Sequence, residues 1–282
     1  MKTKHYLAVG IIGMAFTGLL ITGCAKKEST APASTSADYT AAQDDANGTF
    51  AIEDSKNVSD DGAKGQPGER LMSNCETLLK RDTVIGGNTD SLLDMVFPAN
   101  GCLCGDGRTR AGHIIVWYTP NGYFTLGNTV NMTFKNYSVN NIGISGTRTL
   151  TNVGLDSAGL YTWSFSANLT LTYPNNGGVA TWTSARTNTL TKVGGNWYYE
   201  VTGNASGHSR NNNAYSITIT SPIYVTAFPW WLGGCAFIES GKITVAVTSL
   251  PTIYVSFGTA IGTCSAAMPV TINGTVYNLS QL

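Results

Sequence analysis

The chain has 282 residues, with 17 acidic and 17 basic side chains, so its formal charge is zero. Without a global basic field, nucleic acid is not an expected partner. The charge is unevenly distributed, because residues 25–69 hold nine acids and four bases (net −5), whereas residues 70–282 hold eight acids and eleven bases (net +3). The second segment is long enough for one large all-β domain or two small ones.

Residues 1–23 have the features of a targeting segment. Basic residues precede an apolar run at 6–22, which ends in Ile21-Thr22-Gly23-Cys24. This order resembles a bacterial lipoprotein signal, so we expect cleavage after residue 23, acylation of Cys24 (for example with palmitate) and stable membrane anchoring by two or more chains. The alternative is an uncleaved transmembrane helix, since the run is just long enough to span a bilayer. The absence of Asp at position 25 favours the outer membrane.

Residues 24–69 begin with the acylated cysteine and are rich in Ala, Ser, Thr, Asp and Gly. So few large apolar residues cannot offset the entropy of ordering, and the composition predicts a disordered tether. After it, apolar residues recur at helical spacing in 70–80, which predicts one short helix.

From there to the end the pattern is strand and turn. The strongest stretch is 161–173, where every odd position is apolar and every even position is polar, as in a strand with one buried face. Further strands are predicted at 92–97, 113–118, 130–139, 142–150, 179–190, 197–207, 214–225, 242–248, 252–257, 270–272 and 275–279. Short Asn- and Gly-rich turns imply antiparallel neighbours. We therefore predict an all-β domain at 70–282, a single large antiparallel meander that forms a curved sheet, a sandwich or a barrel.

The cysteines recur at equal intervals. Cys75 and Cys104 are 29 residues apart, as are Cys235 and Cys264, and a phenylalanine lies seven residues before the second cysteine each time. We interpret this as one motif used near each end of the domain. In an exported domain it predicts bridges Cys75–Cys104 and Cys235–Cys264. A Cys75–Cys102 bridge is the alternative to the first, and reduced, buried thiols are the alternative to both.

Four motifs carry a resemblance to a known group. They are D-G-R-T-R-A-G-H-I-I-V (106–116), F-K-N-Y-S-V-N (134–140), G-T-R-T-L-T-N (146–152) and F-G-T-A-I-G-T-C (257–264). Over about residues 75–282 the chain resembles uncharacterised lipoproteins of Bacteroidota. The resemblance implies an all-β, exported, lipid-anchored protein and brings no activity with it. Cys102 and Ser265 depart from the group's pattern.

Candidate catalytic residues are scarce. His113 lies in an apolar stretch and His208 in a Gly-Ser turn, and no G-x-S-x-G elbow accompanies them. Asp156 and Glu200 could form a catalytic carboxylate pair only if folding happened to bring them face to face. We predict no catalytic residue, and no sequence motif implies a cofactor.

Two short segments suggest ligands. The C-x-C at Cys102–Cys104 has no second cysteine pair, so no metal site is expected. The segment 106–110 (D-G-R-T-R) could cradle an anion between two guanidinium groups, but we favour an Asp-Gly turn with solvated arginines.

The aromatic segment 228–232 contains Trp230 and Trp231. It is either a plug for one end of the β core or an exposed site for a sugar or a protein. The sequence thus predicts a lipid-anchored envelope protein with a non-enzymatic binding or structural domain, whose partner is an unidentified protein or glycan. A carbohydrate-binding or carbohydrate-active surface lipoprotein is the alternative.

Overall fold

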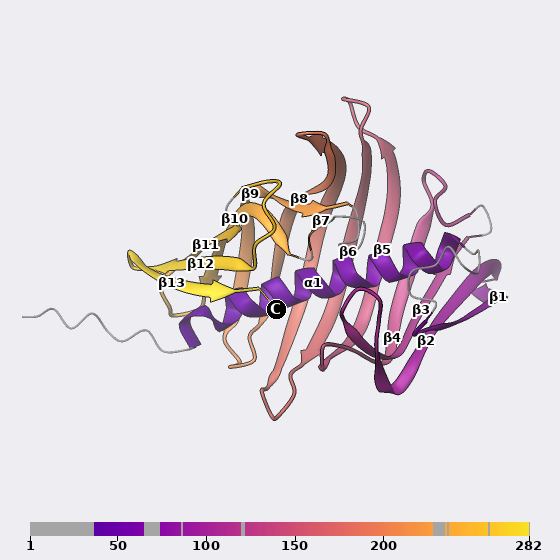
Figure 1. Cartoon of the computed structure of the whole chain (residues 1–282), viewed down its shortest axis with the longest axis horizontal. Coiled ribbons are helices and arrows are strands. Elements are labelled where there is room, and N and C mark those ends of the chain that lie inside the picture. The colour runs from indigo at the N-terminus through magenta and orange to yellow at the C-terminus, as the bar shows by residue number, and fades with distance from the viewer. Residues whose placement is uncertain are drawn as a thin grey trace, which may run out of the picture. The chain divides into compact units, whose positions relative to one another are not determined.

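A computed structural model describes residues 37–64, 74–85, 87–119, 122–227, 235, 237–258 and 260–281. These residues form one helix and 13 strands (Figure 1). The elements are α1 (Ala37–Lys64), β1 (Thr77–Ile85), β2 (Asn88–Leu103), β3 (Thr109–Tyr118), β4 (Thr129–Val139), β5 (Ile142–Leu155), β6 (Tyr161–Thr172), β7 (Val179–Val193), β8 (Asn196–His208), β9 (Ala214–Thr226), β10 (Ile238–Val247), β11 (Ile253–Gly258), β12 (Ala267–Ile272) and β13 (Thr275–Ser280).

All 13 strands belong to one sheet, in which each strand pairs with its neighbours in sequence order and every pairing is antiparallel. The predicted antiparallel meander is therefore confirmed. The sheet is not closed, because β1 and β13 are its two edges. Of the three predicted forms, it is the open, curved sheet. Along β3 the side chains alternate between buried and partly exposed, as the period-two pattern requires.

Tight turns join the long central strands. Asn140 and Asn141, between β4 and β5, have φ values of 48° and 66°. Two successive residues at positive φ match the twist of a two-residue hairpin, and asparagine tolerates this conformation better than most residues.

Bulges interrupt the pairing where the sheet bends. At Gly112 the register between β3 and β4 shifts, and φ is 80°. A Cβ atom at this position would lie 2.0 Å from the carbonyl oxygen of Asn136, so only glycine fits. Bulges of this kind strengthen the local twist and curve the sheet.

Helix α1 corrects the prediction of a disordered tether at 24–69. Residues 37–64 form a helix of 28 residues that crosses one face of the sheet (Figure 1) and contacts β2, β3, β6, β7, β10 and β11. It belongs to the same compact unit as the sheet, Ser34–Leu282, so the β domain does not begin at residue 70. The prediction was wrong because it counted only apolar burial.

The helix has a few apolar contacts of its own. Ala41, Ala42, Ile52 and Val58 are at most 1% exposed and join the single apolar cluster that the inward side chains of the sheet form. Buried residues also occupy the consecutive positions 44–49, so almost the whole circumference of that part of the helix is covered. Most of these residues are polar, and their burial requires polar partners on the sheet.

The short helix predicted at 70–80 is also wrong within the described residues. Residues 77–80 open β1, which pairs with β2 from Thr77 opposite Val96 to Ile85 opposite Asn88. Residues 70–73 lie outside the part of the chain that the structure describes.

Candidate functional site

A cluster of ion pairs joins the middle of α1 to β3. The Arg110 side chain is fully buried, and its Nη2 donates to Asp54 Oδ1 at 2.5 Å while its Nη1 donates to Asp106 Oδ1 at 2.7 Å. Arg108 Nη1 donates to the same Asp54 oxygen at 2.9 Å, and the Tyr137 hydroxyl donates to Oδ2 at 3.0 Å. Burial raises the pKa of Asp54, but attraction to Arg110 and Arg108 outweighs it and holds the pKa below its ordinary value. Asp54 is therefore a buried, ionised anchor of the helix.

This cluster decides between the two interpretations of segment 106–110. The arginines are not solvated: Arg110 is 0% exposed, and the side chain of Arg108 is 15% exposed. The two guanidinium groups do hold an anion, and that anion is the Asp54 carboxylate of the chain's own helix. The Asp-Gly turn itself is present, with the Arg108 amide donating to Asp106 Oδ1 at 3.2 Å, but the expectation of solvated arginines is wrong.

A second cluster holds the N-terminal half of the helix. Arg186, on β7, donates from Nη2 to Asp45 Oδ1 at 3.0 Å and from Nη1 to Thr49 Oγ1 at 2.6 Å. The indole N–H of Trp182 donates to the same Asp45 oxygen at 2.7 Å. Trp182 is completely buried, so its indole N–H and the Arg186 guanidinium both meet Asp45 away from solvent.

A third cluster lies beside the turn between β8 and β9. Asp44 Oδ1 lies 2.9 Å from Arg210 Nε and accepts the Tyr173 hydroxyl at 2.7 Å. Asn47 donates to the same hydroxyl oxygen at 2.9 Å, and the Arg210 guanidinium stacks 4.0 Å from the centre of the Tyr173 ring. Burial raises the pKa of Asp44 despite these partners.

The helix and the face that receives it have complementary charge. Residues 37–64 contain seven acids and two lysines, a net charge of −5. Four of the arginines that meet them are Arg108, Arg110, Arg186 and Arg210. A fifth, Arg148, is only 2% exposed, and its Nε and Nη2 atoms have no hydrogen-bond partner within the described residues. Burial lowers the pKa of Arg148, against an attraction to Glu53.

A pocket of about 330 Å³ opens beside the C-terminal half of α1. Half of the residues in its wall are aromatic, and the rest are aliphatic, amide and charged side chains. It is lined by Lys56, Asp60, Tyr123, Phe124, Leu150, Asn152, Tyr161, Trp163, Leu190 and Tyr199. A concave, mostly apolar pocket with a few polar groups is the usual form of a small-molecule site.

The polar groups of this pocket come mainly from the helix. Lys56 Nζ lies 2.5 Å from Asp60 Oδ2, and it stands 5.2 Å from the centre of the Trp163 ring and 4.8 Å from that of Tyr199. Burial lowers the pKa of Lys56, but attraction to Asp60, Tyr199 and Glu53 together outweighs burial, so the pKa is raised and the ammonium stays charged. The Tyr123 hydroxyl donates to Asp60 Oδ1 at 2.8 Å. The lining of the pocket therefore contains an ion pair whose charges neutralise each other.

The cysteines predicted to form bridges do so in part. Cys75 pairs with Cys102, with Cα atoms 5.6 Å apart, whereas Cys104 is buried outside both bridges. The predicted Cys75–Cys104 bridge is wrong, and the alternative pairing is the one present. Cys102 lies near the end of β2, opposite Arg110 of β3, and the bridge ties it to the segment that precedes β1.

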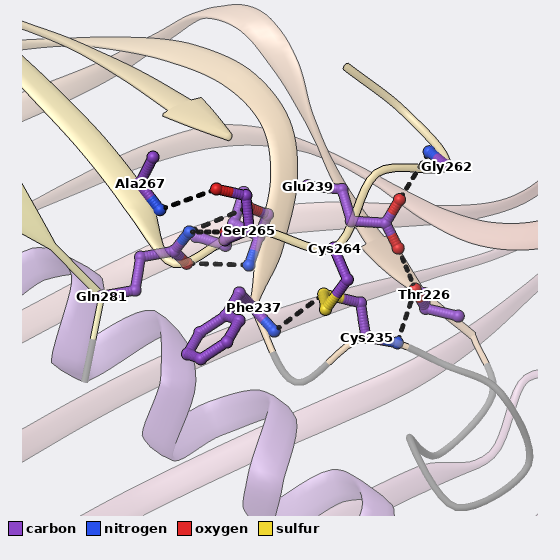
Figure 2. The surroundings of a disulfide bond; sticks show 10 residues. Thr226, Cys235, Phe237, Glu239, Gly262, Cys264, Ser265, Ala267 and Gln281 are labelled. Atoms are coloured by element: carbon purple, nitrogen blue, oxygen red, sulfur yellow. Dashed lines mark hydrogen bonds between the residues drawn. A yellow bond between two sulfur atoms is a disulfide. The ribbon is translucent and has the colours of Figure 1, made fainter. Parts of the chain in front are cut away.

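The pairing of Cys235 with Cys264 is the predicted one, with Cα atoms 5.3 Å apart (Figure 2). The Cys235 amide donates to the Thr226 hydroxyl at 3.1 Å, and Glu239 Oε2 accepts the Gly262 amide at 2.6 Å. The bridge thus ties the segment before β10 to the loop between β11 and β12.

The other candidate residues do not converge. His113 Nδ1 lies 2.9 Å from Asp94 Oδ1, and His208 is exposed at the end of β8. Glu200 accepts a tyrosine hydroxyl from β9, while Asp156 accepts two backbone amides of its own turn. No group of three or more His, Cys, Asp or Glu side chains in the described segments could hold a metal ion. Cys24, Trp230 and Trp231 lie outside the described residues.

The sequence interpretation missed the pocket and the arginines that receive the helix. The sequence did contain a signal for the arginines. Arg148 and Arg186 stand at positions of β5 and β7 where the alternation of apolar and polar residues predicts a buried side chain. A buried cation requires an acidic partner, and the acid-rich segment of the chain is 25–69. The pocket had no such signal, since its walls come from six separate segments.

Comparisons with protein-family models, with curated proteins and with solved structures find no match for this chain. The two disulfides indicate an extracytoplasmic domain. Within the residues that the structure describes, no helix combines the length and the apolar character that crossing a membrane requires.

Proposed function

We propose that the protein is a lipid-anchored, non-enzymatic binding protein of the cell envelope, held in the outer membrane through Cys24. The observation that carries the binding role is the aromatic pocket beside α1, which has the size and composition of a small-molecule site. The disulfides agree with an envelope location, and the lipoprotein-like sequence at 21–24 supplies the anchor.

The carboxylates of α1 support a binding rather than a catalytic role. Asp44, Asp45, Asp54 and Asp60 each bond to an arginine, a lysine or an aromatic side chain. All four are engaged in ion pairs, and those of Asp44, Asp45 and Asp54 join the helix to the sheet.

Two measurements test this proposal. The Cys24→Ala variant should keep its precursor mobility and should not incorporate labelled palmitate, because it lacks the acylated residue. In a thermal-shift screen against small molecules of varied chemistry, at least one compound should raise the Tm of the wild type but not of Tyr161→Ala. Incorporation of labelled palmitate into Cys24→Ala would refute the anchor at Cys24, and a screen without such a compound would refute the binding role.

The runner-up is a carbohydrate-active or carbohydrate-binding surface protein that uses Trp230 and Trp231. It is favoured only by the composition of segment 228–232. Trp230→Ala/Trp231→Ala would abolish glycan binding under this alternative and leave the pocket ligand unaffected under the first proposal.

A further inference from the structure

The pocket beside α1 is surrounded by exposed apolar side chains. Phe124 and Tyr161, which line it, are 55% and 52% exposed, and the adjoining Leu126, Val153 and Leu155 are 56–58% exposed. Hydrogen bonds between Gly127 and Asn152, and between Asn152 and Phe124, fasten the loop before β4 to the end of β5. Exposed apolar groups held in a fixed arrangement mark an interaction site.

Trp163, which lines the pocket, has a hydrogen-bond donor that is unpaired among the described residues. Trp163 packs edge-on against Tyr199, with ring centres 5.3 Å apart. Its indole N–H is buried, and no hydrogen-bond partner for it exists in the described part of the chain. An unpaired buried donor costs free energy, so a ligand that accepts from it gains affinity.

The charges in the pocket select against ionic ligands. Lys56 already occupies the space over the Trp163 and Tyr199 rings, so a cationic ligand would meet a like charge. Asp60 neutralises Lys56 at 2.5 Å, so an anion finds no unpaired cation in the pocket. The Asp60 carboxylate and the Asn152 amide remain able to exchange hydrogen bonds with neutral hydroxyl groups.

We infer that this pocket binds a neutral saccharide, with sugar C–H groups against Tyr161 and Phe124 and a sugar oxygen accepting from Trp163 Nε1. Aromatic faces carry partial negative charge and attract the polarised C–H groups of a pyranose ring. At about 330 Å³ the pocket is at the small end of ligand sites, so it takes one end of a glycan and not a long chain. This inference deepens the proposed function and rests on it.

The helix is part of this site, because it supplies Lys56 and Asp60. The sheet alone would offer aromatic rings without the carboxylate. Docking of α1 therefore completes the saccharide site.

The test uses the full chain, purified in detergent, on a glycan array that displays neutral and anionic glycans. We expect binding to a neutral glycan. Titration calorimetry with the corresponding soluble disaccharide should show an affinity loss of about tenfold or more for Trp163→Phe, which keeps an aromatic ring but removes the N–H donor. Tyr161→Ala should cause a loss of similar size.

Two matched controls are available outside the pocket. Trp197→Phe changes a tryptophan that meets Lys192 at 5.7 Å, and Tyr254→Ala removes a tyrosine that is 57% exposed on β11. Both should keep the affinity within about twofold.

Binding to anionic glycans alone, no glycan binding, or equal affinity of Trp163→Phe, Tyr161→Ala and the wild type would each overturn the inference. A non-saccharide compound that stabilises the wild type but not Tyr161→Ala would leave the proposed function standing while this inference falls.

Discussion

Helix α1 approaches the sheet closely at Gly48, which lies against the ring of Trp182. A Cβ atom built on Gly48 would lie 2.6 Å from Trp182 Cδ2 and 2.7 Å from Cγ. The ring cannot easily move, because Trp182 is 0% exposed, donates to Asp45 and carries the Arg186 guanidinium 5.2 Å from its centre. Gly48→Ala therefore tests directly whether the helix occupies this position.

Whether Gly48→Ala stabilises or destabilises the protein depends on whether α1 is packed on the sheet. In an undocked, solvated helix, replacing Gly by Ala stabilises by about 1 kcal/mol. In the docked helix, overpacking costs about 1–3 kcal/mol, and weakening the Asp45 contacts costs about 1 kcal/mol more. We expect a net loss of about 2 kcal/mol, which lowers the Tm of a domain of this size by about 4–8 °C.

Gly62→Ala is the matched control on the same helix. Its Cβ would lie 2.9 Å from Met95 Sδ, in a flexible side chain that can shift at little cost. This variant should remain within about 1 kcal/mol of the wild type in urea unfolding followed by tryptophan fluorescence and circular dichroism. If Gly48→Ala proves as stable as the wild type or more so, α1 does not pack on Trp182 and the reasoning fails.

The cysteines and the ion pairs give three further predictions. Cys102→Ser should lower the free energy of unfolding by about 3.5 kcal/mol, because it opens the bridge to Cys75. Cys104→Ser should leave that bridge in place. A Cys75–Cys104 peptide in non-reducing mass mapping would contradict the pairing. Asp54→Asn should lower the free energy of unfolding by about 3 kcal/mol, since it leaves a buried arginine cluster short of one charge; Asn57→Ala on the same helix should change it by less than about 0.5 kcal/mol. Because the folded-state pKa of Asp54 is depressed, its contribution is fully present above the unfolded pKa of about 4 and is lost as the pH falls through the folded pKa. The stability difference between wild type and Asp54→Asn should thus stay constant from about pH 7 to pH 5 and shrink below about pH 4, and a difference that already shrinks at pH 6 would refute the assigned pKa shift.

The sheet was predictable because its signal is local. Residues 161–173 alternate strictly, and β6 covers Tyr161–Thr172 with the apolar side chains from Phe165 to Leu171 buried. The Asn140-Asn141 turn was likewise readable, because two residues able to take positive φ stood between two alternating runs. Strand β1 was missed because most of its residues are exposed on both faces, so burial imposed no alternation on its sequence.

The helix was unpredictable from its own residues for a different reason. Its buried positions include Asp44, Asp45, Glu53 and Asp54, which read as solvated side chains in any local window. Their burial is made favourable by a set of arginines some 50–170 residues away in sequence, of which Arg110 and Arg186 are examples. Only the folded sheet brings these arginines together on one face. The local composition of residues 24–69 does not reveal them, so it predicted disorder.

The polar interface also fixes the register of the helix. Asp44 pairs with Arg210, Asp45 with Arg186 and Asp54 with Arg110. The arginines therefore follow one another along the helix in the reverse of their order in the sequence. An apolar stripe could slide by a turn and still be buried, but a slide of one turn, about 5.4 Å, would separate every one of these pairs at once.

The register of the helix also determines the polar groups of the pocket. Only with Asp54 on Arg110 does the following turn and a half of α1 carry Lys56 over the Trp163 ring and Asp60 to the Tyr123 hydroxyl. The arginine clusters and the pocket are therefore parts of one arrangement, in which the ion pairs along the helix position the groups that give the aromatic pocket its polarity. A sheet that bound the same helix through apolar contacts alone would be as well covered, but it would not determine where the Asp60 carboxylate stands.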